Sequence, residues 1–186
     1  VAGQTTGADV AALVVDNGAT LTITGEGAVE GNSYGVYAKN GALNIEGGKY
    51  SAETSAVQVN EATVNISGGE FSNTASDKRY TINCIDANWN NGTAKVNITG
   101  GKYIDFNPAN NAAEGAGTNF VAAGYQAAET AANVWEVVLE GKDYILSPGN
   151  SIDIPLKAIH SLQNPFKEDV KIIEVQKGHP LIEEDI

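Results

Sequence analysis

The chain is poor in several residue types, and each shortage excludes a class of protein. Its 186 residues contain no methionine, even at position 1, one cysteine, Cys84, and one arginine, Arg79. A lone cysteine excludes an internal disulfide framework and a zinc site built from several cysteines. No apolar run approaches roughly 18 residues, the length that a membrane-spanning helix needs. A start without methionine is expected of a processed product or a fragment.

Basic side chains are also scarce. The chain has 23 acidic and 11 basic residues, and its formal net charge is −12. Nucleic acids and anionic membrane surfaces are bound by basic faces, so we expect neither nucleic acid nor membrane as a partner. A chain of this length fits one domain, or one domain with a small appendage, and it buries roughly 70% of its unfolded surface.

What the sequence does contain is an internal repeat. Four segments alternate apolar and polar side chains and end in glycine, and their starts differ by 22, 21 and 32 residues. They are Leu21–Gly25, Leu43–Gly47, Val64–Gly68 and Val96–Gly100. This alternation predicts a short strand with one buried face, closed by a turn. A second strand is expected before each of them, at 13–15, 36–38, 57–59 and 82–87, with an Asn/Gly turn between the first three pairs.

Coils of 21–22 residues, made of strands and turns, favour an all-β fold: a right-handed parallel β-helix with like side chains stacked in ladders. The alternative is an antiparallel β-sandwich. The expected ladders are Ala28, Tyr50, Phe71 and Tyr103; Asn44, Asn65 and Asn97; and Lys49, Glu70 and Lys102. The expected core consists of Leu21, Ile23, Leu43, Ile45, Val64, Ile66, Val96 and Ile98, with Leu13, Val15, Val36, Val57 and Val59 on another wall.

The longest step between repeats contains an inserted loop at about residues 72–91. Insertions in a solenoid emerge as loops on one face, often the binding face. The loop supplies the candidate ligand-binding residues, which are Asp77, Arg79, Tyr80, Trp89 and Asn90. Trp89 has two interpretations, since its ring is able either to stack on a sugar or to fold back onto the solenoid.

Residues 1–138 resemble the glycine-rich parallel β-helices of bacteriophage fibre and spike proteins and of surface proteins of gut bacteria. The resemblance is carried by the repeated Asn-Ile-x-Gly-Gly-x-aromatic motif and by the segments 106–110, 119–125 and 134–138. It implies a fibre or decoration module of a virion or of a bacterial cell surface. The implied partners are a surface glycan, or the capsid or another virion protein.

Residues 139–186 have a different composition and resemble half of a cupin, a small jelly-roll barrel. The second cupin motif, G-x5-P-x-G-x2-H-x3-N, is matched in spacing by four residues, although Lys157 stands where glycine is usual. The four are Gly149, Pro155, His160 and Asn164. The ending is similar to the C-terminal cupin of mannose-1-phosphate guanylyltransferases and type II phosphomannose isomerases. The resemblance would make His160 a metal ligand, but the first cupin motif, with the other ligands, is missing. We therefore expect no metal and no cofactor.

No catalytic constellation is evident, so we predict no catalytic residue. Asp86 and Asp105 would have the separation of a glycosidase carboxylate pair if they lay on neighbouring coils, but solvated turn residues are the simpler interpretation. Cys84 is expected to be a buried apolar residue rather than a nucleophile.

Two functions stay open. One is a non-catalytic structural or binding module, and the other is a carbohydrate-active or sugar-phosphate enzyme. Open solenoid ends and open strand edges in the tail predict a homo-oligomer, with a trimer favoured and contacts made by Ile145, Leu146, Ile154, Ile172 and Ile173.

Overall fold

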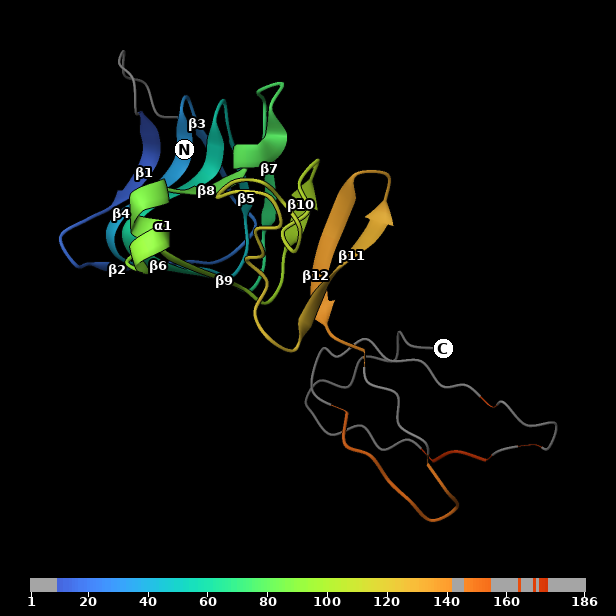
Figure 1. Ribbon diagram of the computed structural model, residues 1–186. Helices are drawn as coiled ribbons and strands as arrows, with labels where there is room; N and C mark the ends of the chain where they lie inside the picture. Colours follow the sequence, from blue (N-terminus) through green and yellow to red (C-terminus); the bar gives the residue numbers. More distant parts are fainter. Residues whose placement is uncertain (1–9, 142–145, 155–163, 165–168, 170, 174–186) are drawn as a thin grey trace.

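The strands stack as successive coils of a parallel β-solenoid, which confirms the predicted all-β fold class. The computed structural model describes residues 10–141, 146–154, 164, 169 and 171–173. The solenoid begins at β1 and ends against a two-stranded hairpin, which stands beside the last coil (Figure 1). Helix is confined, within these ranges, to the short turn η1 (Lys78–Tyr80) and to α1 (Asp86–Asn91). Neither is long and apolar enough to cross a membrane.

Each coil contributes to three walls. The first wall contains β1 (Ala11–Val15), the first part of β4 (Tyr34–Ile45), the first part of β6 (Ser55–Ile66), and β8 (Ile82–Cys84). The second wall contains β2 (Thr20–Ile23), the second parts of β4 and β6, and β9 (Lys95–Ile98). The third wall contains β3 (Ala28–Gly31), β5 (Lys49–Ala52), β7 (Glu70–Asn73) and β10 (Lys102–Ile104). All pairs between coils are parallel.

The predicted pairs of strands are confirmed in the first coil and merge in the next two. β4 and β6 are each one continuous strand of 12 residues, so the turns expected at 39–41 and 60–61 are bends within a strand. The ladder survives the bend, because Asn40 pairs with Glu61 and Gly41 with Ala62. Gly41 has a φ of +117°, a conformation that a residue without a Cβ adopts easily.

The aromatic ladder lies on the third wall. Tyr50 and Phe71 stack with ring centroids 5.0 Å apart, and Phe71 and Tyr103 stack at 5.1 Å. The position before Tyr50 is occupied by Val29, so the prediction of Ala28 is wrong. The first coil has Gly25-Glu26-Gly27 where the next has Gly47-Gly48, and the extra residue shifts the register by one.

The two polar ladders are confirmed. Asn65 Nδ2 donates to Asn44 Oδ1, and Asn97 Nδ2 donates to Asn65 Oδ1, both at 3.0 Å on the second wall. Glu70 pairs in register with Lys49 and Lys102, and Lys102 Nζ lies 3.0 Å from Glu70 Oε2. Both ladders are partly exposed, so they specify register more than they stabilise the fold.

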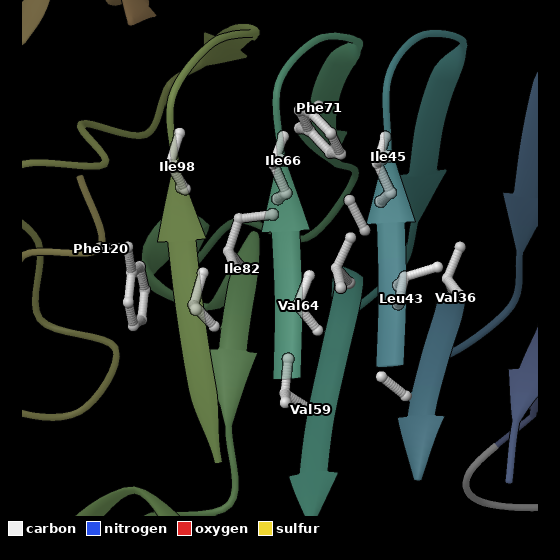
Figure 2. Close-up of a cluster of buried hydrophobic side chains, with 14 of the residues drawn as sticks. Val36, Leu43, Ile45, Val59, Val64, Ile66, Phe71, Ile82, Ile98 and Phe120 are labelled. Carbon is white, nitrogen blue, oxygen red and sulfur yellow. The ribbon is translucent and has the colours of Figure 1, made fainter. Parts of the chain in front are cut away.

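One hydrophobic core runs along the solenoid axis, as predicted. Figure 2 shows Ile45, Ile66 and Ile98 at matching positions of neighbouring strands, and all three are fully buried. The other expected residues that are buried are Val15, Val36, Leu43, Val57, Val59, Val64 and Val96. Leu13, Leu21 and Ile23 lie in the first coil and are partly buried against this core.

The extra residues of the longest step are divided between two corners. Val57 pairs with Ile82 and Val64 pairs with Val96, so the step between coils grows from 21 residues to 25 and then to 32. The first corner holds η1 and the second holds α1, with β8 between them. Asp86 is therefore the first residue of a helix and does not lie in a strand, contrary to the expectation.

The last coil is covered by residues 105–124, here called the cap segment, and by the hairpin of β11 (Tyr125–Ala131) and β12 (Val134–Leu139). The backbone of Ile98 exchanges hydrogen bonds with Phe120 and Ala122, which closes the edge of β9. β12 pairs with β10 in the antiparallel sense, so the parallel stack ends there. This covers the strand edges that further coils would otherwise pair with.

Candidate functional site

A hollow opens at the first corner, between η1, the cap segment and β12. Its volume is about 540 Å³. It is lined by Ser76, Asp77, Lys78, Arg79, Asp105, Phe106, Asn107, Asn110, Asn111, Ala112 and Trp135. Most of these side chains carry hydrogen-bonding groups, and Trp135 and Phe106 are aromatic.

Asp77 and Arg79 form a fixed ion pair at the rim of the hollow. Asp77 accepts the backbone N–H of Arg79 at 3.1 Å, and its carboxylate binds the guanidinium at 2.6 to 3.0 Å. Hydrogen bonds from the Arg79 side chain and then from its backbone lower the pKa of Asp77. Asp77 is therefore ionised at neutral pH, and it is not suited to donate a proton as a general acid.

The neighbouring basic side chain, Lys78, is also held by a hydrogen bond. Lys78 Nζ donates to the carbonyl oxygen of Asn73 at 2.6 Å, and the Arg79 guanidinium lies 5.1 Å from the centre of the Tyr80 ring. Both basic side chains hold the shape of this corner. Asp77 balances the charge of Arg79, whereas the Asn73 carbonyl is neutral and leaves Lys78 charged.

Trp135 and Asp105 come from the segments that cover the last coil: Trp135 from β12 and Asp105 from the start of the cap segment. Trp135 pairs with Tyr103 across the β10–β12 ladder, and its side chain is half-buried. Asp105 follows β10 with a φ of +55°, and its backbone N–H donates to Asn133 at 2.7 Å. The antiparallel hairpin thus brings an indole, some 30 residues later in the sequence, beside the carboxylate of Asp105 at the same hollow.

Asparagines shape the wall made by the cap segment. Asn107 Oδ1 accepts the N–H of Ala109, and Asn111 Oδ1 accepts the N–H of Ala113, both at 3.0 Å. Such bonds from a side chain to the backbone two residues on are typical of Asx turns. Asn110 is exposed at the rim.

The five candidate residues from the inserted loop are separated by the structure. Asp77 and Arg79 line the hollow, and Tyr80 lies under Arg79. Trp89 and Asn90 belong to α1 at the other corner, where the Trp89 ring meets Phe120 edge-on at 5.3 Å. Trp89 packs against the core, as one of its two interpretations had it.

Trp135 and the asparagines of the cap segment were not among the candidates. Tryptophan in the segment 134–138 was visible as a family motif, but alternation alone gives no strand partner. Only the antiparallel pairing with β10 brings it to η1, and that pairing joins residues distant in sequence.

A second hollow of about 780 Å³ follows the same edge of the solenoid toward its start. Ser76 lines both hollows. The second is lined by Glu30, Gly31, Asn32, Ser51, Ala52, Glu53, Thr74, Ala75 and Ser76. Two carboxylates and no cation lie along it, so the combined surface is polar and weakly acidic.

The carboxylate pair considered from sequence does not line one site. Asp105 faces the first hollow, whereas Asp86 opens α1 at the second corner. Cys84 is buried, as expected, and burial raises the pKa of its thiol well above the ordinary range. No group of three His, Cys, Asp or Glu side chains that could hold a metal is found within the described residues.

The cupin-like motif is described only in part. Gly149 has a φ of +88°, and Asn164 is exposed. Pro155 and His160 lie outside the described residues.

Comparison with known proteins concerns the C-terminal part. Residues 128–186 match the family model described as mannose-6-phosphate isomerase C-terminal. The chain is 38% identical over 55 residues to a mannose-1-phosphate guanylyltransferase of Klebsiella pneumoniae, and 41% identical over 51 residues to the alginate biosynthesis protein AlgA of Pseudomonas aeruginosa. These matches cover 30% and 27% of the chain, but 12% and 11% of the relatives. No solved structure matches the chain.

The similarity confirms the cupin-like nature of the C-terminal segment. The match begins at residue 128, inside β11, so the hairpin that closes the solenoid lies largely within the cupin-like sequence.

Proposed function

We propose that the protein is a non-catalytic structural and binding module, and that the hollow at η1 binds a glycan. The observation that carries this proposal is the composition of the hollow: the half-buried indole of Trp135 among amides, carboxylates and the Asp77–Arg79 pair. Sugar rings present C–H faces that pack on aromatic rings, and hydroxyl groups that pair with amides and carboxylates.

The charge of the surface supports an uncharged ligand. Along the first hollow, Asp77 and Asp105 match Lys78 and Arg79 in number, while Glu30 and Glu53 leave the adjoining hollow acidic. Polysaccharides rich in uronate or sulfate would meet repulsion there. A virion or a bacterial cell surface is the location we propose, because a repeat scaffold with a surface hollow suits display and attachment.

The test is a binding measurement on a panel of neutral and acidic glycans. Trp135→Ala should weaken binding of a neutral glycan at least tenfold, whereas Trp135→Phe should retain part of it. Asn110→Ala removes an amide at the rim of the hollow. Its matched control is Asn97→Ala, which removes an amide on the second wall, away from the hollow. If Trp135→Ala and Asn97→Ala bind equally well, the glycan site is not at this hollow.

A second candidate is a sugar-phosphate protein, favoured by the match of residues 128–186 to the mannose-6-phosphate isomerase C-terminal family. Isomerisation of mannose 6-phosphate, abolished by His160→Ala, would establish it. Release of reducing ends or of unsaturated products from a polysaccharide would likewise show that the protein is an enzyme and not a non-catalytic binding module.

A further inference from the structure

One carboxylate attaches the cap segment to the free edge of β8. The N–H of Cys84 donates to Glu114 Oε1 at 2.6 Å. β8 pairs with β6 on its other side, and it is the last strand of the first wall. Glu114 therefore provides the acceptor that a further coil would have provided.

Two buried oxygen atoms of residues at this contact lack a donor within the described part of the chain. They are Asn83 Oδ1 and Glu114 Oε2. Asn83 Nδ2 donates to Gln58 Oε1 on β6 at 3.0 Å, and Asn83 directly precedes Cys84, whose N–H binds Glu114. A buried acceptor without a donor is destabilising, and a proton on Glu114 Oε2 would give this edge of β8 the donor that it lacks.

Among the residues that the structure describes, no cation forms an ion pair with Glu114. Burial, followed by the negative charge of Asp86 on α1, raises its pKa, while the Cys84 N–H acts in the opposite direction. On β8 the titratable neighbour is the Cys84 thiol, which is neutral. The groups that face Glu114 from β8 and α1 thus add no positive charge.

We propose that Glu114 is a pH-dependent latch of the cap segment. With the segment closed, the carboxyl group is neutral, its proton is on Oε2, and this O–H donates to Asn83 Oδ1. At higher pH the proton passes to solvent, and the charged Oε2 then faces Asn83 Oδ1 and Asp86. The cap segment leaves the edge of β8 to hydrate this charge.

Opening of the cap segment should also change the wall of the hollow, and this step rests on the proposed function. Asp105, Asn107, Asn110 and Asn111 line the hollow and belong to the cap segment, and Glu114 follows Asn111 by three residues. Glu114 is a positioning residue for that wall. The affinity of the hollow should consequently fall as the pH rises.

The direction follows from linkage. The closed form holds the proton more tightly than the open form, in which Glu114 has its ordinary pKa of 4.5. Closure is therefore fully favoured below about pH 4.5, and it weakens as the pH rises through the closed-state pKa. Within that window, the opening equilibrium grows by up to about tenfold for each pH unit.

Cys84 is the only cysteine and lies under this edge, so its labelling by a disulfide reagent reports opening. Glu114→Gln keeps the acceptor for Cys84 and gives Asn83 Oδ1 a permanent N–H donor. Dividing the wild-type rate by that of Glu114→Gln at each pH cancels the ionisation of the thiol. The ratio should be near one well below pH 4.5 and should rise as the pH increases above it, and the exposed control Glu61→Gln should follow the wild type.

A ratio that does not change with pH overturns the latch. The latch is also wrong if, at pH 5, Cys84 is labelled as fast in Glu114→Gln as in Glu114→Ala. In that case the neutral amide would not hold the cap segment closed, and closure would require a charged carboxylate. A carbon-13 titration of the wild-type carboxyl groups needs no variant, and Glu114 must titrate above its ordinary pKa of 4.5. If no glycan binds, the proposed function fails while the labelling result stands; if a glycan binds and the ratio is flat, the latch alone fails.

Discussion

At the scale of single residues, the strongest stabilisation comes from side chains at equivalent positions of successive coils. Ile66 is fully buried, and it is in register with Ile45 on one side and Ile98 on the other. Each of these isoleucines packs against the equivalent side chain of the adjacent coil. A truncated side chain therefore leaves a cavity in the core, because the neighbouring strands are held at a fixed distance.

We expect Ile66→Ala to lower the free energy of unfolding by about 2–5 kcal/mol in chemical denaturation, because a central buried side chain is removed. Val14→Ala is the matched control: Val14 is also a strand residue but is 55% exposed, so the change should stay below about 0.5 kcal/mol. Equal losses for the two variants would contradict the continuous core.

The sequence predicts residues well where one rule decides their place. Alternation and a constant period identify Ile45, Ile66 and Ile98 as core, and the ladder of asparagines follows from the same count. Val29 was missed because Glu26 adds a residue to a turn, and a short turn leaves no trace in the apolar pattern. Trp135 was missed because its site depends on an antiparallel pairing that the repeat does not encode.

At the scale of elements, the repeat in the sequence predicts where the strands lie, but it does not predict the conformation of the corners between them. Where β4 and β6 bend, the backbone ladder continues through the corner, so the expected pair of strands is one element. The insertion was visible as a long step, but its division into η1 and α1 depends on where β8 rejoins the stack. Local propensity alone does not fix that choice, because β8 is only three residues long.

Glycines at the corners between the second and third walls let successive coils approach closely, and this gives a prediction at the same scale. A Cβ on Gly68 would lie 2.4 Å from the backbone oxygen of Glu46 in the previous coil. Gly68→Ala should therefore cost about 1–3 kcal/mol of stability, as overpacking does. Gly27→Ala is the control, since no atom lies within 4 Å of its added Cβ. Thermal unfolding compares the two, and a stable Gly68→Ala protein would contradict the tight stacking of coils.

At the scale of the whole molecule, the solenoid is closed asymmetrically. The cap segment and the β11–β12 hairpin cover the last coil, whereas β1, β2 and β3, within the described residues, pair with one neighbouring coil only. The first coil also leaves Leu13, Leu21 and Ile23 incompletely buried. Among the described residues after the hairpin, several large apolar side chains are exposed: Leu146, Ile152, Ile154, Ile172 and Ile173.

Exposed apolar side chains of this kind mark contact surfaces in soluble proteins, and identical chains usually bury them through closed cyclic symmetry. We therefore predict a homo-oligomer, with a trimer favoured, whose contacts include Leu146, Ile154, Ile172 and Ile173. Ile145, the other expected contact, lies outside the described residues. Light scattering should give a multiple of the 19.3 kDa chain mass. Ile173→Asp, at a side chain that is 90% exposed, should reduce that mass, because a charge placed in an apolar contact is costly. Val14→Asp is the matched control outside the tail, and it should leave the mass unchanged.

A chain ending at Gly141 retains the whole hairpin and should be a monomer. A 19.3 kDa mass for the intact chain at micromolar concentration would mean that this apolar surface is not a contact between copies.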